Sequence, residues 1–408
     1  MRCDLLFNNQ SHSNLLRLLN ENKRNAMKNN RRDFIKKTAI FTTTASLAGL
    51  MSTCTQSTYK DKSSGLEPGP YVKDGGIKFA FLNSPTSPKV PFARQLAVNY
   101  AVSGVERIRG LNAWDPEAIK ATKAAWDREG IKWYVVEGPP SLGTKTKLGL
   151  DGRDEEISNF ITFMKYLKQY GDVDIICYNW MPVISWARTN QERPGRGGAL
   201  MLEFDYEVMK PAPLTEYGEV SKEHLWTTLE YFVKAVMPEA EKTGMRMSMH
   251  PDDPQVDVIQ GISRIMNTVA GHERLLSMYP KPCNGITMCQ ANYMGMPDLV
   301  NIPGLIRRWG RDIINFVHFR NVKDLSGVRP STHFTETFHD EGDIDMYEAM
   351  KAYIEIGFDG PMRPDHVPVM ATETEAGMRG GYTTLGNLYA IGYMRGLAEA
   401  VAKELSRS

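Results

Sequence analysis

Short apolar runs alternate with longer amphipathic stretches along the chain from residue 77 to the C-terminus. Short apolar runs bounded by turn residues predict strands, and stretches with apolar residues every three to four positions predict helices. The predicted strands cover residues 77–82, 103–108, 131–138, 173–180, 245–250, 284–289, 314–319 and 359–366. The predicted helices cover residues 115–129, 154–169, 221–242, 259–269, 298–309, 345–356 and 385–404.

This alternation predicts one domain over residues 77–408, a (β/α)8 TIM barrel. A doubly wound open sheet is the alternative, because it is built from the same succession of strands and helices. No Gly-x-Gly-x-x-Gly motif follows an early strand, which disfavours a dinucleotide-binding version of that alternative.

Four of the later strands end on side chains that can bind a metal ion: His250 in MRMSMH, Cys289 in NGITMC, His318 in INFVHF and Asp365 in GPMRPDH. Each one alone also fits an ordinary structural role, such as a hydrogen-bonded histidine or a buried thiol. In a closed barrel, however, the ends of all strands surround one mouth, so we expect the four to meet. Their donor atoms suit Zn²⁺, Fe²⁺ or Mn²⁺ without ranking these ions.

The turns after these strands add charged neighbours. Asp252 or Asp253, in HPDDP, could orient the imidazole of His250. Arg320 follows His318, and Arg363 precedes Asp365. An arginine at such a place either binds a substrate carboxylate or forms an ion pair at the barrel rim.

The composition is that of an ordinary globular protein, with 42% hydrophobic and 24% charged residues. The net charge of +1 gives no electrostatic attraction to nucleic acid or an anionic membrane, so we expect neither as a partner. The five cysteines form no CxxC pair and no disulfide-dense pattern. The 22 methionines are expected to fill the core.

Residues 27–54, MKNNRRDFIKKTAIFTTTASLAGLMSTC, resemble a twin-arginine export signal. Arg31 and Arg32 precede an apolar stretch that is too short for a permanent membrane span. We therefore predict an N-terminal extension and signal over residues 1–54, translation from Met27, a polar linker over residues 55–76, and a periplasmic location. Lipid attachment at Cys54 is a weaker alternative, because Thr53 is an unusual residue before a lipidated cysteine.

Eight stretches of the chain follow one another in an informative order. They are ICYNWMPV (176–183), MHPDDP (249–254), NGITMC (284–289), IRRWG (306–310), VHFRNVK (317–323), FTETFHDEGDIDMYEAMKA (334–352), GPMRPDH (360–366) and GGYTTLGNLYAIGYMRGL (380–397). In this order they resemble the mannonate dehydratase family, closely so over residues 170–400.

The resemblance implies a xylose-isomerase-like TIM barrel and a hydro-lyase that uses Mn²⁺ to convert the sugar acid D-mannonate to 2-keto-3-deoxy-D-gluconate and water. It also implies a homo-oligomer. By position it places the metal ligands on His250, Cys289, His318 and Asp365, and the catalytic residues on Arg363, His366 and Tyr382. The reaction needs a base for the C2 proton and an acid for the C3 hydroxyl, and His339 is a further candidate for proton transfer.

The first third of the barrel departs from the family pattern. The stretches FAFLNSPTSP, VERIRGLNAW and PPSLGTKTKLG lack residues that are usual there, and Thr335 stands where a histidine is usual. These changes fall on the side expected to meet the distal part of the substrate. Two alternatives therefore stay open: a sugar isomerase or epimerase on the same barrel, and an exported sugar-binding protein without catalysis.

Overall fold

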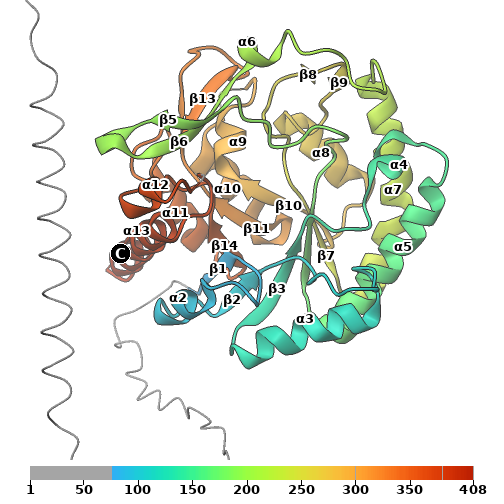
Figure 1. The fold of residues 1–408 in the computed structure, drawn as a ribbon, viewed down its shortest axis with the longest axis horizontal. Helices are drawn as coiled ribbons and strands as arrows, with labels where there is room; N and C mark the ends of the chain where they lie inside the picture. Colours follow the sequence, from blue (N-terminus) through green and yellow to red (C-terminus); the bar gives the residue numbers. More distant parts are fainter. Residues whose placement is uncertain (1–75, 299, 379, 408) are drawn as a thin grey trace, which may run out of the picture. The chain divides into compact units, whose positions relative to one another are not determined.

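The computed structural model describes residues 76–298, 300–378 and 380–407 (Figure 1). The predicted export signal, Cys54 and the predicted linker up to residue 75 lie outside the described residues. Within the described part of the chain, no helix has the length and apolar character needed to cross a membrane.

Eight parallel strands close into a barrel in the order β1-β14-β11-β10-β7-β4-β3-β2 (Figure 1). Their bounds are β1 (Lys78–Leu82), β2 (Tyr100–Val102), β3 (Lys132–Glu137), β4 (Ile175–Tyr178), β7 (Arg246–Met249), β10 (Asn284–Cys289), β11 (Ile314–Phe319) and β14 (Pro361–Pro364). The closed barrel confirms the predicted (β/α)8 fold and rules out the open sheet.

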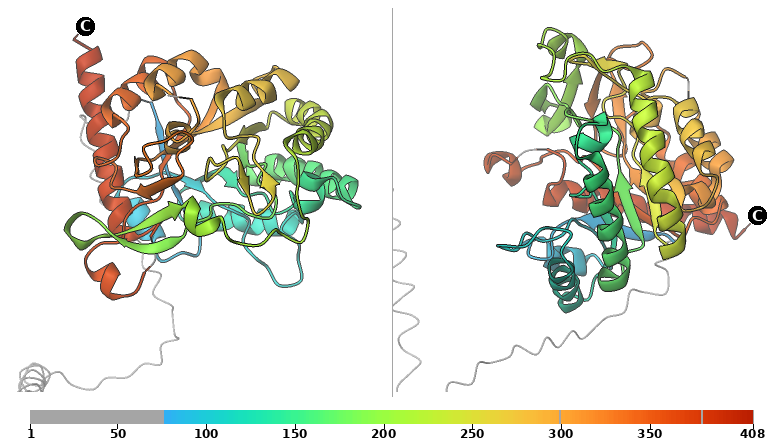
Figure 2. Two further views of the ribbon diagram at one scale, coloured as in Figure 1. Left: turned by 90° about the horizontal axis from the view of Figure 1, so that it is seen from above. Right: turned by 90° about the vertical axis from the view of Figure 1, so that its right-hand side faces the viewer.

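Helices surround the barrel, as Figures 1 and 2 show. The longer ones are α2 (Val90–Gln95), α3 (Pro116–Arg128), α5 (Arg153–Tyr166), α7 (Lys222–Thr243), α8 (Val269–Met278), α10 (Ile302–Ile313), α11 (Met346–Glu355) and α13 (Thr384–Leu405). Short helices lie in the loops: α4 (Thr144–Leu148), α6 (Tyr206–Met209), α9 (Gln290–Met294) and α12 (Thr372–Glu375). The start of α7 is capped by Ser221, whose hydroxyl accepts from the His224 amide, and Gly244 ends it at a φ of 68°.

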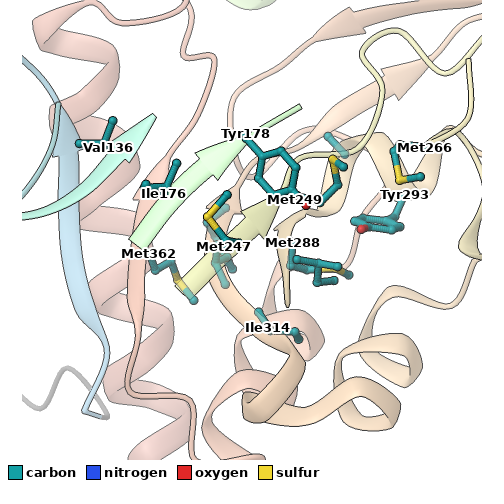
Figure 3. Close-up of a cluster of buried hydrophobic side chains, with 14 of the residues drawn as sticks. Val136, Ile176, Tyr178, Met247, Met249, Met266, Met288, Tyr293, Ile314 and Met362 are labelled. Atoms are coloured by element: carbon teal, nitrogen blue, oxygen red, sulfur yellow. The ribbon is translucent and has the colours of Figure 1, made fainter. Parts of the chain in front are cut away.

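Alternate residues of the strands pack into two separate layers. The barrel interior holds a small cluster: Ala80, Val102, Val135, Ile175, Cys177 and Phe316. The opposite faces of the strands pack against the helices in a much larger core that is rich in methionine, including Met247, Met249 and Met288 (Figure 3). These methionines are fully buried, which confirms their predicted role as core filler.

A second, antiparallel sheet is built entirely from loops that follow barrel strands. Its order is β12 (Val322–Asp324), β13 (His333–Glu336), β6 (Leu200–Asp205) and β5 (Asn190–Pro194). Strands β5 and β6 belong to the loop after β4, and β12 and β13 belong to the loop after β11. The sheet therefore stands at the carboxyl end of the barrel, where active sites of this fold lie.

Two predicted elements were wrong. Strand β2 ends at Val102 rather than covering 103–108, because residues 101 and 102 are buried whereas Glu106 and Arg107 could not face either layer. Residues 259–268 form no helix: β8 (Val258–Ile259) and β9 (Ile262–Ser263) make a hairpin there, and α8 begins only at Val269. Gln260 and Gly261 both have positive φ, which suits a tight turn and opposes a helix.

We expect Gly285→Ala to lower the midpoint of thermal unfolding, by an effect worth about 1–3 kcal/mol. A Cβ on Gly285, inside β10, would clash with the Asn315 side chain and fall 2.5 Å from the carbonyl oxygen of Ile313. The control is Gly392→Ala in α13, where a Cβ meets nothing within 4 Å. Gly392→Ala should leave the stability unchanged or raise it by about 0.5–1 kcal/mol. Equal midpoints of thermal unfolding for the two variants would contradict the close packing around β10.

Candidate active site

The four predicted metal ligands come from four barrel strands that are direct neighbours, β7, β10, β11 and β14. Cys289 and His318 pair across β10 and β11, and His318 is level with Arg363 on β14. His250 and Asp365 directly follow the ends of β7 and β14. The side chains therefore meet along one arc of the mouth.

The donor atoms lie close enough to share one ion. One ligand atom each from His250, Cys289 and His318 lies within 4.8 Å of the others. The Nε2 atom of His250 is 3.2 Å from the Nδ1 atom of His318, which is 3.6 Å from Oδ2 of Asp365. That same oxygen lies 3.9 Å from the Sγ atom of Cys289. Such spacings fit ligands that each stand about 2.0–2.3 Å from a common ion.

The protonation states of the two imidazoles also suit a metal. Burial, reinforced by His318, lowers the pKa of His250 to about 3, and burial together with Arg363 lowers the pKa of His318. Both rings are therefore neutral. The Nδ1–H group of His250 donates to the Pro251 carbonyl oxygen at 2.7 Å, which leaves the lone pair of Nε2 available for an ion.

The other two ligands differ in charge. Burial raises the pKa of the Cys289 thiol, so the sulfur keeps its proton until a cation replaces it. Burial alone would also raise the pKa of Asp365, but Arg363, His366 and His318 outweigh it and hold the pKa well below the usual range. Two neutral imidazoles, a carboxylate and an ionisable thiol fit a divalent transition metal.

Arg363 links this cluster to the opposite side of the mouth. Its guanidinium lies 2.6 Å from Oδ1 of Asp365 and 2.9 Å from Oε1 of Glu137, the last residue of β3. The hydroxyl of Tyr382 donates to Oδ1 of Asp365 at 2.9 Å. Oε2 of Glu137 lies 3.5 Å from Nε2 of His318, so a carboxylate faces the imidazole nitrogen that points away from the cluster.

A second buried ion network joins the antiparallel sheet to the site. Arg188, just before β5, pairs with Asp253 at 2.8 Å and with Glu336 of β13 at 2.6 Å. Arg320 binds the same two carboxylates. Oε1 of Glu336 also lies 2.8 Å from Nδ1 of His366, a residue with a positive φ of 45°. Glu336 therefore fixes the ring of His366.

The structure corrects one expectation about polar neighbours and decides between two alternatives for the arginines. Neither Asp252 nor Asp253 orients His250, because its Nδ1 atom is bound to the Pro251 carbonyl. Asp253 instead holds the two arginines, and Asp252 accepts the Met266 amide. Both candidate rim arginines, Arg320 and Arg363, are in ion pairs with protein carboxylates.

His339 lies apart from the other predicted site residues. Its side chain is buried, its Nε2 atom is 2.7 Å from the Phe319 carbonyl oxygen, and burial lowers its pKa to about 4. The neutral ring is bound to the backbone of β11, whereas Arg363, His366 and Tyr382 all approach Asp365. The structure therefore brings together seven of the eight predicted residues.

The sequence analysis missed three charged residues of the site: Glu137, Arg188 and Glu336. Glu137 could have been found, because it ends a predicted strand as the four ligands do. Arg188 and Glu336 gave no such signal, since they lie in loops whose pairing into a sheet depends on contacts between distant segments.

A closed parallel barrel with metal donors and acid–base side chains at the carboxyl ends of its strands defines a (β/α)8-barrel enzyme. The family model for D-mannonate dehydratase (UxuA) matches residues 87–214 and 211–408. The mannonate dehydratase of Streptococcus uberis is 36% identical over 317 residues, which cover 71% of this chain and 88% of that protein. Mannonate dehydratase 2 of Halalkalibacterium halodurans is 32% identical over 341 residues, 77% of this chain and 96% of that protein.

Solved structures agree. The crystal structure of mannonate dehydratase from Streptococcus suis serotype 2 matches with a TM-score of 0.70 and 29% identity, and covers 81% of this chain and 96% of that one. A structure of L-ribulose 3-epimerase, with a TM-score of 0.50 and 10% identity over 81% of this chain and 96% of that one, shares the fold alone. The chain belongs to the D-mannonate dehydratase (UxuA) family and is a sugar-acid dehydratase, a hydro-lyase. The isomerase and epimerase alternative is not favoured.

Replacing His250 or Cys289 by alanine should weaken binding of a divalent ion strongly. The loss should exceed the ~10–100-fold that is typical when a residue that only hydrogen-bonds to a metal ligand is removed. The measurement is the ion content of protein stripped with a chelator and dialysed against known concentrations of Mn²⁺ or Zn²⁺. His333→Ala is the control, because His333 is partly exposed on β13 and pairs with Glu203. Unchanged ion affinity in both ligand variants would contradict the metal site.

Proposed function

We propose that this enzyme converts D-mannonate to 2-keto-3-deoxy-D-gluconate and water, with one divalent cation held by His250, Cys289, His318 and Asp365. The observation that carries the proposal is the convergence of these donors on one point beside His366 and Tyr382. The names of the relatives supply the substrate, and the donor atoms fit the ion.

Mn²⁺ is the proposed ion, with Fe²⁺ and Zn²⁺ as alternatives to be compared in the same assay. When bound, such a cation polarises the substrate carboxylate and makes the neighbouring C2 proton more acidic. The rest of the chemistry is proton transfer, which falls to side chains of the chain itself.

His366 is the proposed base for the C2 proton. Its Nδ1 atom is held by Glu336 at 2.8 Å, which leaves Nε2 to accept a proton. That nitrogen lies 3.9 Å from Oδ1 of Asp365, beside the proposed ion. A carboxylate on Nδ1 stabilises the positive charge that the ring gains when it takes the proton.

Tyr382 is the proposed acid for the departing C3 hydroxyl. Burial raises the pKa of its phenol well above the usual range, with Asp365 and Glu137 adding to the effect and Arg363 opposing it. The phenol therefore carries its proton at neutral pH. Arg363, 5.4 Å from the ring, would stabilise the phenolate formed when that proton leaves.

The test of the proposed function is turnover by the purified full chain. Metal-stripped protein reloaded with Mn²⁺, Fe²⁺ or Zn²⁺ should form a 2-keto acid from D-mannonate with loss of one water in the product mass. Absence of product with every ion would overturn the substrate, and a product of unchanged mass would indicate isomerisation. Light scattering in the same preparation tests the expected homo-oligomer.

Tyr382→Phe should lower kcat by about 10²–10⁴-fold with little change in KM, because the ring stays and only the transferable proton is lost. Ion content should stay at the wild-type value. Tyr393→Phe is the control, since Tyr393 lies in α13, where its ring stacks on that of Tyr389. Wild-type kcat in Tyr382→Phe would remove Tyr382 from proton transfer.

We also propose export through the twin-arginine route, supported by Arg31 and Arg32 ahead of the apolar stretch. That route carries folded proteins, so a metal ion can be bound before export. Arg31→Lys with Arg32→Lys should trap the protein in the cytoplasm, as followed by cell fractionation. Lys36→Gln is the matched control, and export of the double variant would contradict the proposal.

A further inference from the structure

Lys147 is a buried cation that the proposed chemistry leaves without a role. It lies in α4, in the loop after β3, and its side chain is only 8% exposed. Its Nζ atom lies 2.9 Å from Oδ1 of Asn179, a neutral partner. Among the described residues, no carboxylate forms an ion pair with Lys147.

Asn179 brings this cation to the barrel mouth. Asn179 follows β4, in which the side chains of Ile175 and Cys177 face the barrel interior. Because side chains alternate between the two faces of a strand, that of Asn179 lies on the same inner face. Tyr178 pairs with Met249 across β4 and β7, which puts Asn179 level with His250. Neighbouring strands are about 4.8 Å apart, so the pair borders the proposed metal ligands.

Three arginines of the mouth, in contrast, are already paired with protein carboxylates. Arg188 and Arg320 both form ion pairs with Asp253 and Glu336, and Arg363 forms ion pairs with Glu137 and Asp365. They cannot receive a further carboxylate without releasing a protein partner. Lys147 can, because only an amide oxygen has to move.

A second unpaired cation lies near Lys147. Arg264 is fully buried, its Nη2 atom donates to the Ile184 carbonyl, and its Nε and Nη1 atoms have no hydrogen-bond partner among the described residues. Burial and the charge of Arg264 lower the pKa of Lys147 to about 8, while Asp252 and Glu156 act against them. Asp252 is the buried carboxylate that acts on both cations, but among the described residues neither Lys147 nor Arg264 forms a direct ion pair with it.

We propose that Lys147 is a substrate-binding residue whose ammonium receives the carboxylate of the sugar acid, with Asn179 holding Nζ in position. The assignment rests on the proposed function for the class of substrate. A carboxylate has two oxygens, so one can meet Lys147 while the other stays on the side of the four metal ligands. The incoming negative charge compensates the buried cation, and a neutral polyol cannot do this.

The test compares binding of acids with binding of the matching neutral polyols. Calorimetry with the metal-loaded full chain would use D-mannonate against D-mannitol and D-gluconate against D-glucitol. The variants are Lys147→Met, which keeps the apolar stem, and Asn179→Asp, which keeps the amine but gives it a carboxylate of its own. Lys145→Met is the control, because Lys145 is exposed on the same helix.

Both variants should bind the acids about 10–100-fold more weakly and the polyols as wild type does, so the preference for the acid is lost. Ion content and melting temperature should match the wild-type values, and Lys145→Met should behave as wild type. A preference for the acid that survives in Lys147→Met would overturn the assignment, and so would equal weakening of acid and polyol.

The outcomes also separate this assignment from the proposed function. If wild-type protein prefers the acids but forms no 2-keto acid, the reaction is wrong and the Lys147 assignment is still decided by the variants. If wild-type protein binds no acid better than its polyol, the Lys147 assignment is overturned together with the class of substrate.

Discussion

Compensation of buried charge at the carboxyl end of the barrel is the constraint on which the rest of the site depends. The side chains of Arg188, Arg320 and Arg363 are at most 3% exposed and meet four carboxylates: the buried Asp253, Glu336 and Asp365 and the partly buried Glu137. Removing one member would leave the remaining charges with fewer partners in a mostly buried place, which costs more than losing a surface ion pair. The geometry of the mouth is therefore fixed as a unit.

The same balance is compatible with a divalent cation at the proposed metal ligands. Within the ion-paired set, three guanidiniums and four carboxylates carry one net negative charge, and ionisation of the Cys289 thiol would add another; Lys147 and Arg264 lie outside this set. A divalent ion held by Cys289 and Asp365 would offset the charge of both side chains. Because burial raises the pKa of the Cys289 thiol, its proton would be released only when such an ion binds.

The barrel could be predicted from sequence because its signals are local. Strand β7 ends directly before His250 and β10 ends on Cys289, and parallel closure alone then brings these candidate ligands together. The hairpin at Gln260 and Gly261 was missed because its apolar residues imitate a helical spacing, whereas the positive φ values that decide it leave a weak mark in sequence. Arg188 and Glu336 were missed because their partners are distant along the chain.

Several residues around the proposed acid and base lie in loops rather than in barrel strands. The antiparallel sheet holds some of these loops in a fixed position. Strand β13 lies between β6 and β12, and Glu336 at its end pairs with Val322 of β12, so its backbone is held in the sheet while its side chain meets His366. The left-handed backbone at His366 would be unfavourable in isolation, and the bond to Glu336 helps hold it. A residue strained in this way cannot swing freely, so the position of its Nε2 atom relative to Asp365 is set by the sheet as much as by the barrel.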